Sequence, residues 1–214
     1  MKHNKNMLFQ FGILIIGVYL MGVGTSLSLS STLSGDAVAF LWDACSTKTG
    51  LTVEMINTIF TILLLTIVVK FDITKLGIGT LMCPIIQNFG IWTTNLMLST
   101  ISITSGIMDI AIGLIGISIL SVGCGIFAYV NLGISAYLGT GKIISEKLNI
   151  NYGLVIVITD GLCFIFAAIL SQSIAIGPLI ATCISGPLID LTMRSMPVFS
   201  KYRKGKNYEN NISM

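Results

Sequence analysis

The 214-residue sequence has little of the chemistry that most enzymes use. Its one histidine, His3, lies in the polar N-terminus, so no histidine is left to act as a general base elsewhere in the chain. This excludes Ser-His-Asp and Cys-His catalytic sets and the usual histidine-rich metal sites. The five cysteines are isolated and form no C-x-x-C pair, which argues against a disulfide framework. Basic residues are not interleaved with aromatic ones in a patch, so nucleic acid is not an expected partner. We therefore expect neither an enzyme nor a bound cofactor or metal.

Charge is also scarce, at 10% of residues against about 25% in soluble domains. The mean hydropathy is +0.91, and 54% of residues are hydrophobic. A water-soluble fold has too much surface for this composition. The lipid bilayer is therefore the expected solvent of the chain.

Two fragments look like catalytic motifs but lack essential residues. Gly139-Thr140-Gly141-Lys142 resembles the end of a phosphate-binding loop, yet the first glycine and the final Ser or Thr of that motif are missing. Ser34-Gly35-Asp36 lacks the first glycine of the G-x-G-D pattern of intramembrane aspartyl proteases and lies outside an apolar run. Neither fragment predicts an activity.

Apolar runs of about 20 residues, the length that crosses a bilayer as a helix, dominate the sequence. They predict an all-α membrane protein with six transmembrane helices, at residues 7–29, 51–69, 76–98, 106–130, 152–170 and 174–193. The segments 30–50 and 131–151 are too polar to span and are expected to lie at the interface or to be re-entrant, with Trp42 as an interfacial anchor. Residues 197–214 form a basic, polar tail.

The basic residues predict the orientation of these spans. Short cytoplasmic loops carry an excess of Lys and Arg. With the N-terminus in the cytoplasm, Lys48 alone lies on the outer side. The other eleven lie on the cytoplasmic side: Lys2, Lys5, Lys70, Lys75, Lys142, Lys147, Arg194, Lys201, Arg203, Lys204 and Lys206. Both termini are therefore expected in the cytoplasm.

The two halves of the chain, residues 1–100 and 101–196, resemble each other at an offset of 98 or 99 residues. For example, Lys48-Thr49-Gly50-Leu51 is echoed by Lys147-Leu148-Asn149-Ile150, and Ile78-Gly79-Thr80-Leu81 by Ile176-Gly177-Pro178-Leu179. Each half reads as a span, a semi-polar segment and two further spans. Three crossings place the second half upside down relative to the first, as in many secondary transporters. We therefore expect two inverted three-helix repeats.

Four short motifs carry a resemblance to a known family: Leu132-Gly133-Ile134-Ser135, Thr49-Gly50-Leu51-Thr52, Gly77-Ile78-Gly79-Thr80 and Gly186-Pro187-Leu188-Ile189-Asp190. Over residues 10–195 the chain resembles the YczE/YyaS/YitT family of small bacterial membrane proteins, especially its YczE-like branch. The resemblance implies an architecture in the bacterial inner membrane much more than an activity. The chain departs from that pattern at Ile156, where relatives tend to have an arginine four residues before Asp160.

Polar residues inside the apolar runs form the candidate site. Asp160 falls near the middle of its span, where a carboxylate is costly and marks a functional site by default. Glu54, Asn57 and Thr61 share one helical face, and Gln87 and Asn88 occupy the following span. These six residues are candidates for binding a substrate or ion. Asp160 could instead be a hydrogen-bonded structural residue, and the amides could join helices. Asp190 and Arg194 are spaced for an ordinary interfacial ion pair.

The leading functional hypothesis is a small transporter or permease-like protein that binds a small molecule or ion at these residues. A second possibility is a non-transporting membrane factor that assists another membrane or biosynthetic protein. A third is the substrate-binding subunit of a multi-component importer. The second and third require a membrane-protein partner.

Overall fold

The computed structural model describes residues 2–71, 76–100, 106–130, 132–133, 135–150, 152–171 and 175–196. These residues are all-helical. The helices are α1 (Lys2–Leu29), α2 (Ala37–Thr49), α3 (Val53–Phe71), α4 (Ile78–Leu98), α5 (Ile107–Val130), α6 (Ala136–Leu148), α7 (Tyr152–Ser171) and α8 (Gly177–Ser195). The six long helices lie where the apolar runs predict them, whereas the basic tail lies outside the described residues.

In the described part of the chain, four helices are long and apolar enough to cross a membrane: Phe9–Leu29, Val53–Phe71, Ile107–Val130 and Leu154–Ser171. Their outer faces carry large apolar side chains, such as Leu63, which is 62% exposed, and Ile169, which is 67% exposed. Exposed apolar surface of this extent indicates contact with lipid. The described chain is therefore that of a multi-pass membrane protein. The amides in α4 lower its hydropathy, and the apolar part of α8, Gly177–Met193, is shorter.

The short helices α2 and α6 have matching ends. Asp36 and Ser135 are their N-caps and accept hydrogen bonds from the Ala39 and Leu138 amides, respectively. Each helix ends at a left-handed residue, Gly50 or Asn149. The sequence echo between residues 48–51 and 147–150 is thus an echo of one C-cap structure.

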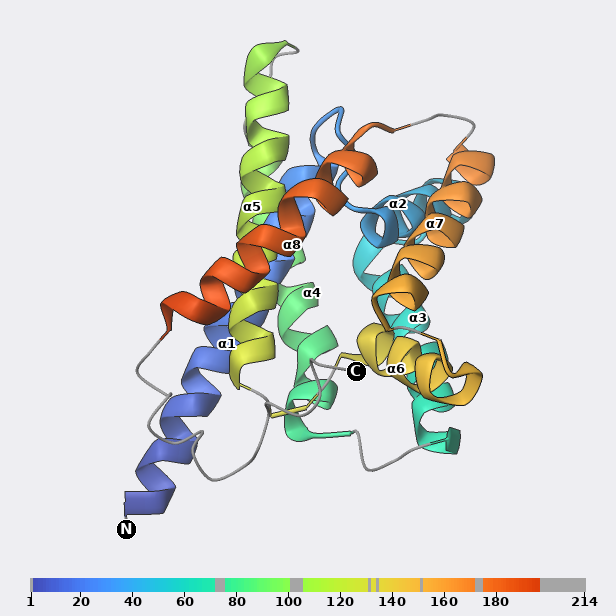
Figure 1. Cartoon of the computed structure of the whole chain (residues 1–214). Coiled ribbons are helices and arrows are strands. Elements are labelled where there is room, and N and C mark those ends of the chain that lie inside the picture. The colour runs from blue at the N-terminus through green and yellow to red at the C-terminus, as the bar shows by residue number, and fades with distance from the viewer. Residues whose placement is uncertain are drawn as a thin grey trace.

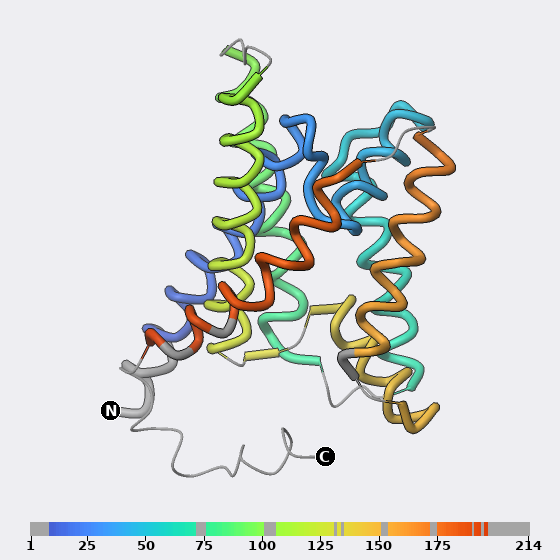
Figure 2. Tube along the Cα trace, turned by 45° about the horizontal axis from the view of Figure 1, so that its top comes forward, coloured from blue at the N-terminus to red at the C-terminus, as the bar shows by residue number. Residues whose placement is uncertain are grey.

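The eight helices divide into two groups (Figures 1 and 2). The first helix group comprises α1, α4, α5 and α8, and the second comprises α2, α3, α6 and α7. Each group contains helices from both halves of the chain. Figure 1 also shows that corresponding helices run in opposite directions: α1 rises where α5 descends, and α7 rises where α3 descends.

Glycines let α1 and α5 pack with their backbones in close contact. A Cβ atom added at Gly24 would lie 2.3 Å from the Leu120 nitrogen, and one at Gly123 would lie 2.6 Å from the Gly17 oxygen. Helix pairs in membranes rely on such close backbone approach because no hydrophobic force drives them together. The glycines of α1 and α5 therefore allow these two helices to pack closely. Gly12 is an exception, with open space around it.

In each half, the start of the last helix (α4 or α8) contacts the loop that precedes the short helix of the other half. The Gly79 amide donates to the Leu132 carbonyl at 3.0 Å. A Cβ atom at Gly177 would lie 1.7 Å from the corresponding carbonyl, that of Leu33. Only glycine fits at that point, because any side chain would overlap the carbonyl. These two contacts interlock the halves.

Candidate functional site

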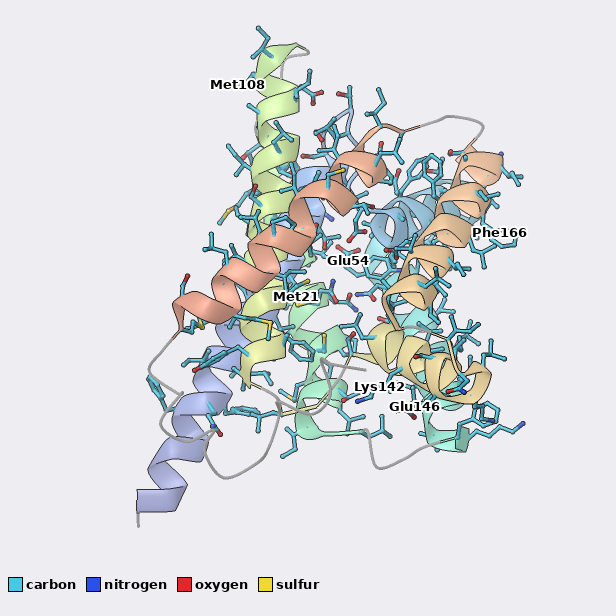
Figure 3. All side chains as sticks on the ribbon, viewed as in Figure 1. Met21, Glu54, Met108, Lys142, Glu146 and Phe166 are labelled. Atoms are coloured by element: carbon cyan, nitrogen blue, oxygen red, sulfur yellow. The ribbon has the colours of Figure 1, made fainter. Side chains whose placement is uncertain are left out.

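A cavity of about 270 Å³ lies between the two helix groups and is lined by residues of all eight helices and the two N-caps. Met21, which lines it, is near the centre of Figure 3, whereas Phe166 of α7 points away on the outer surface. Most of the wall is apolar, with a few polar groups among the apolar side chains. Small-molecule sites have this composition.

The cavity is lined by matching positions of the two halves. At an offset of 99, the pairs are Met21/Leu120, Thr25/Cys124, Asp36/Ser135, Ala37/Ala136, Val38/Tyr137, Asn57/Ile156 and Thr61/Asp160. At an offset of 98, in α4 and α8, they are Cys83/Ala181, Pro84/Thr182 and Gln87/Ser185. Both members of each pair contribute to the wall. The cavity therefore lies where the two halves meet symmetrically, although its chemistry is unequal, since the partners of Asp36 and Asp160 are hydroxyl residues.

Two carboxylates enter the cavity from opposite halves. Asp36 reaches it from the N-terminus of α2 while its Oδ1 accepts from the Ala39 amide at 2.7 Å. Burial raises the pKa of Asp36 to about 6, and the negative charge of Asp160 adds to the increase. Asp160, from α7, accepts a hydrogen bond from the Tyr137 hydroxyl of α6. Burial and this hydrogen bond raise the pKa of Tyr137, so the tyrosine stays a donor.

Four of the six predicted site residues line the cavity: Asp160, Asn57, Thr61 and Gln87. Asn57 and Gln87 are buried, and the Thr61 hydroxyl donates to Asn57 Oδ1 at 3.2 Å. That these residues bind a substrate remains a prediction, because their placement shows only that they share one cavity.

Glu54 and Asn88 lie outside the cavity wall and join α3 to α4 instead. Asn88 accepts from Asn57 Nδ2 at 2.7 Å and donates to the Thr58 hydroxyl at 2.7 Å and the Glu54 carbonyl at 3.1 Å. The Glu54 carboxylate accepts from Asn95 Nδ2 at 3.1 Å. This α3–α4 seam connects the two helix groups. The side chains of Asp190 and Arg194, the predicted ion pair, lie outside the described part of the chain.

Trp42 corrects one expectation. The polar sequence around it suggests an interfacial anchor, but the ring is 7% exposed, lines the cavity and packs edge-on against Phe60 at 6.2 Å between ring centroids. Helix α2 packs against α7, so its aromatic residue faces protein. Asp109 of α5 is also buried, and it accepts from the Thr32 amide and hydroxyl at 3.0 and 2.5 Å.

Sequence reasoning did not select Asp36, Tyr137 or Trp42 for the site. Each lies in or beside a short helix whose polar composition suggested a surface. The internal repeat gives one signal for two of them. Asp36 aligns with the N-cap Ser135, and Tyr137 aligns with Val38. Nothing in the sequence indicates that Trp42 faces inward.

Comparisons with curated proteins and with solved structures gave no match. One family model matches residues 8–194, most of the chain and all of the cavity wall. The protein thus belongs to DUF6198, a family of unknown function.

Proposed function

We propose that this protein is a small transporter of the bacterial inner membrane and that the central cavity holds its substrate. The observation that carries the proposal is a cavity lined by all eight helices, at matching positions of both halves, between two helix groups. Secondary transporters place their sites near mid-membrane at such a repeat interface. The absence of a histidine-based or metal-based catalytic set in the sequence fits transport better than catalysis.

The proposal includes six crossings and two inverted repeats. It adds α4 and α8 to the four helices that meet the length and hydropathy of a span. Their outer faces support this, since Ile85 of α4 is 65% exposed and Leu191 of α8 is 60% exposed. Corresponding long helices run in opposite directions, as an inverted repeat requires (Figure 1).

The termini lie in the cytoplasm in this arrangement. Lys70, at the end of α3, and Lys147, at the end of α6, approach the same ring, with the Lys147 Nζ 3.4 Å from the Phe71 centroid. Lys142 also lies toward this end of the molecule, whereas Met108 of α5 lies at the other end (Figure 3). This end is expected to face the cytoplasm because it gathers basic residues.

Transport requires the cavity to open on each side in turn, by movement of one helix group against the other. The α3–α4 seam resists separation on one side through the hydrogen bond that Asn57 donates to Asn88. The counterparts of these residues, Ile156 and Gly186, have no side-chain hydrogen-bonding group. We therefore propose that the cavity opens more readily along α7 and α8 than along α3 and α4.

Cysteine labelling tests this function. In a background with the five native cysteines replaced, Ser185→Cys places a thiol on the cavity wall, and Ile85→Cys is a matched control on the outer face. Each is treated with a membrane-impermeant methanethiosulfonate, in spheroplasts and in inside-out vesicles. A transporter predicts labelling of Ser185→Cys from both sides and of Ile85→Cys from neither.

The other outcomes favour the alternatives. Labelling of the cavity from one side only would indicate a binding protein, such as an importer subunit. No labelling from either side would overturn the transporter proposal and favour a membrane accessory factor. The resemblance to the YczE/YyaS/YitT family stays a prediction and does not decide among these functions.

A further inference from the structure

We propose that the cavity recognises a small organic cation that also carries a hydrogen-bond acceptor. This inference rests on the proposed function, because it names the substrate class of the same cavity. Three independent features of the wall support it: its charge, its aromatic residues and one unpartnered donor.

The charge of the wall is negative. Asp36 and Asp160 both line the cavity, and no lysine, arginine or histidine is among the described residues of its wall. Each carboxylate has few partners: Asp36 accepts from the Ala39 and Val38 amides, and Asp160 accepts from the Tyr137 hydroxyl. The raised pKa of Asp36 has the same cause, burial with too little compensation. A bound cation would supply the missing compensation.

The remainder of the wall favours an organic cation over a metal ion. The rings of Trp42, Phe60, Phe127 and Tyr137 line the cavity beside the carboxylates. Aromatic faces attract organic cations and accommodate their apolar parts. Metal ions such as Ca²⁺ need about six oxygen ligands. Among the described residues, no group of three His, Cys, Asp or Glu side chains could hold a metal ion.

The unpartnered donor is the indole nitrogen of Trp42. In the described part of the chain, this Nε1 is the only buried side-chain nitrogen or oxygen without a hydrogen-bond partner. The ring is 93% shielded, since 7% of it is exposed, and it lines the cavity. A buried donor of this kind is costly unless a partner arrives. Because protein atoms cover Nε1 itself, a ligand with a carbonyl or ether oxygen would become that partner once the Trp42 ring turns this nitrogen toward the cavity.

Tryptophan fluorescence gives a direct test because the chain has two tryptophans. Trp92 lies on α4, 55% exposed, so Trp92→Phe leaves Trp42 as the only reporter, inside the cavity. Three probes of similar shape separate the features: acetylcholine (cation and acceptor), 3,3-dimethylbutyl acetate (neutral, with the same acceptor) and pentyltrimethylammonium (cation without the acceptor). All three are titrated into purified Trp92→Phe protein.

We expect a saturable change in Trp42 emission with acetylcholine. The neutral ester should bind at least about tenfold more weakly, and pentyltrimethylammonium about fivefold more weakly, for the loss of one hydrogen bond. Asp36→Asn and Asp160→Asn should each weaken acetylcholine binding at least about tenfold. Asp43→Asn is the matched control, because Asp43 lies on α2 but not on the cavity wall, and it should leave binding unchanged.

Equal binding of the neutral ester, or no saturable response to either cation, would overturn the inference. The comparison of the three probes needs no carboxylate variant, so a variant that fails to fold does not affect it. Cysteine labelling of Ser185→Cys decides the transporter proposal separately. A cavity labelled from both sides that does not prefer cations would refute the substrate class and keep the proposed function.

Discussion

Replacing Asp36 by asparagine should stabilise the protein at neutral pH and much less at acidic pH. The folded protein holds the Asp36 pKa at about 6, against 3.8 for the ordinary group, mainly because of burial. Between these two pH values the folded state binds more protons than the unfolded state, so the free energy of unfolding falls as pH rises. The cost of Asp36 to folding therefore begins above about pH 3.8 and reaches its full size above about pH 6.

The magnitude follows from the pKa difference. A shift of about two units, at about 1.4 kcal/mol per unit, corresponds to about 3 kcal/mol at pH 7.5. By the same linkage, about 1 kcal/mol should remain at pH 4.5, where the unfolded carboxyl is partly protonated. Asn can replace Asp as the N-cap of α2, since its Oδ1 can accept from the Ala39 amide as the carboxylate does.

The assay is unfolding by SDS titration in mixed micelles, followed by circular dichroism at both pH values. Asp36→Ala is the matched control, because it removes the charge and the cap together. It should be about 1 kcal/mol less stable than Asp36→Asn at both pH values. The reasoning would be refuted if Asp36→Asn were no more stable than the wild type at pH 7.5, or if its advantage did not depend on pH.

Three further predictions concern packing and hydrogen bonds. Gly24→Ala should lower the free energy of unfolding by about 1–3 kcal/mol, because its Cβ would lie 2.3 Å from a backbone nitrogen of α5. Gly12→Ala, in open space, should be neutral, and equal melting temperatures for the two variants would contradict the close packing. Tyr137→Phe should destabilise by about 1–3 kcal/mol by removing the donor to Asp160, and a double-mutant cycle with Asp160→Asn should show coupling, whereas additive effects would exclude it. Asn88→Leu should cost about 2 kcal/mol for three hydrogen bonds to α3, measured by SDS unfolding, and an unchanged stability would show that the seam does not hold the groups together.

The sequence predicts the helices well because the bilayer imposes strong constraints. Apolar runs of a set length and polar breaks locate all six long helices within a few residues of their ends, apart from the start of α1. The internal offset predicts that Thr61 and Asp160 are counterparts, and both reach the cavity. A carboxylate within an apolar run is visible without a structure.

The inner wall of the cavity was less predictable because α2 and α6 are polar enough to resemble surface segments. Whether such a helix lies on the membrane or inside the protein depends on packing by distant helices, as when α7 covers α2. Asp36 and Trp42 were therefore missed. Glu54 and Asn88 lie close to lining residues along their helices, but their hydrogen bonds join α3 to α4 in the seam.

The central claim is that the two helix groups move against each other around the cavity. Distances between spin labels test it most directly, with one pair across the groups, at Leu154 of α7 and Leu191 of α8, and a control pair within the first group, at Ile115 of α5 and Leu191; all three positions are exposed. In proteoliposomes, the account predicts that the Leu154–Leu191 pair shows two distance populations, or a distance that shifts when acetylcholine is added. The control pair should show one distance that does not change. A single unchanging distance for both pairs would contradict it.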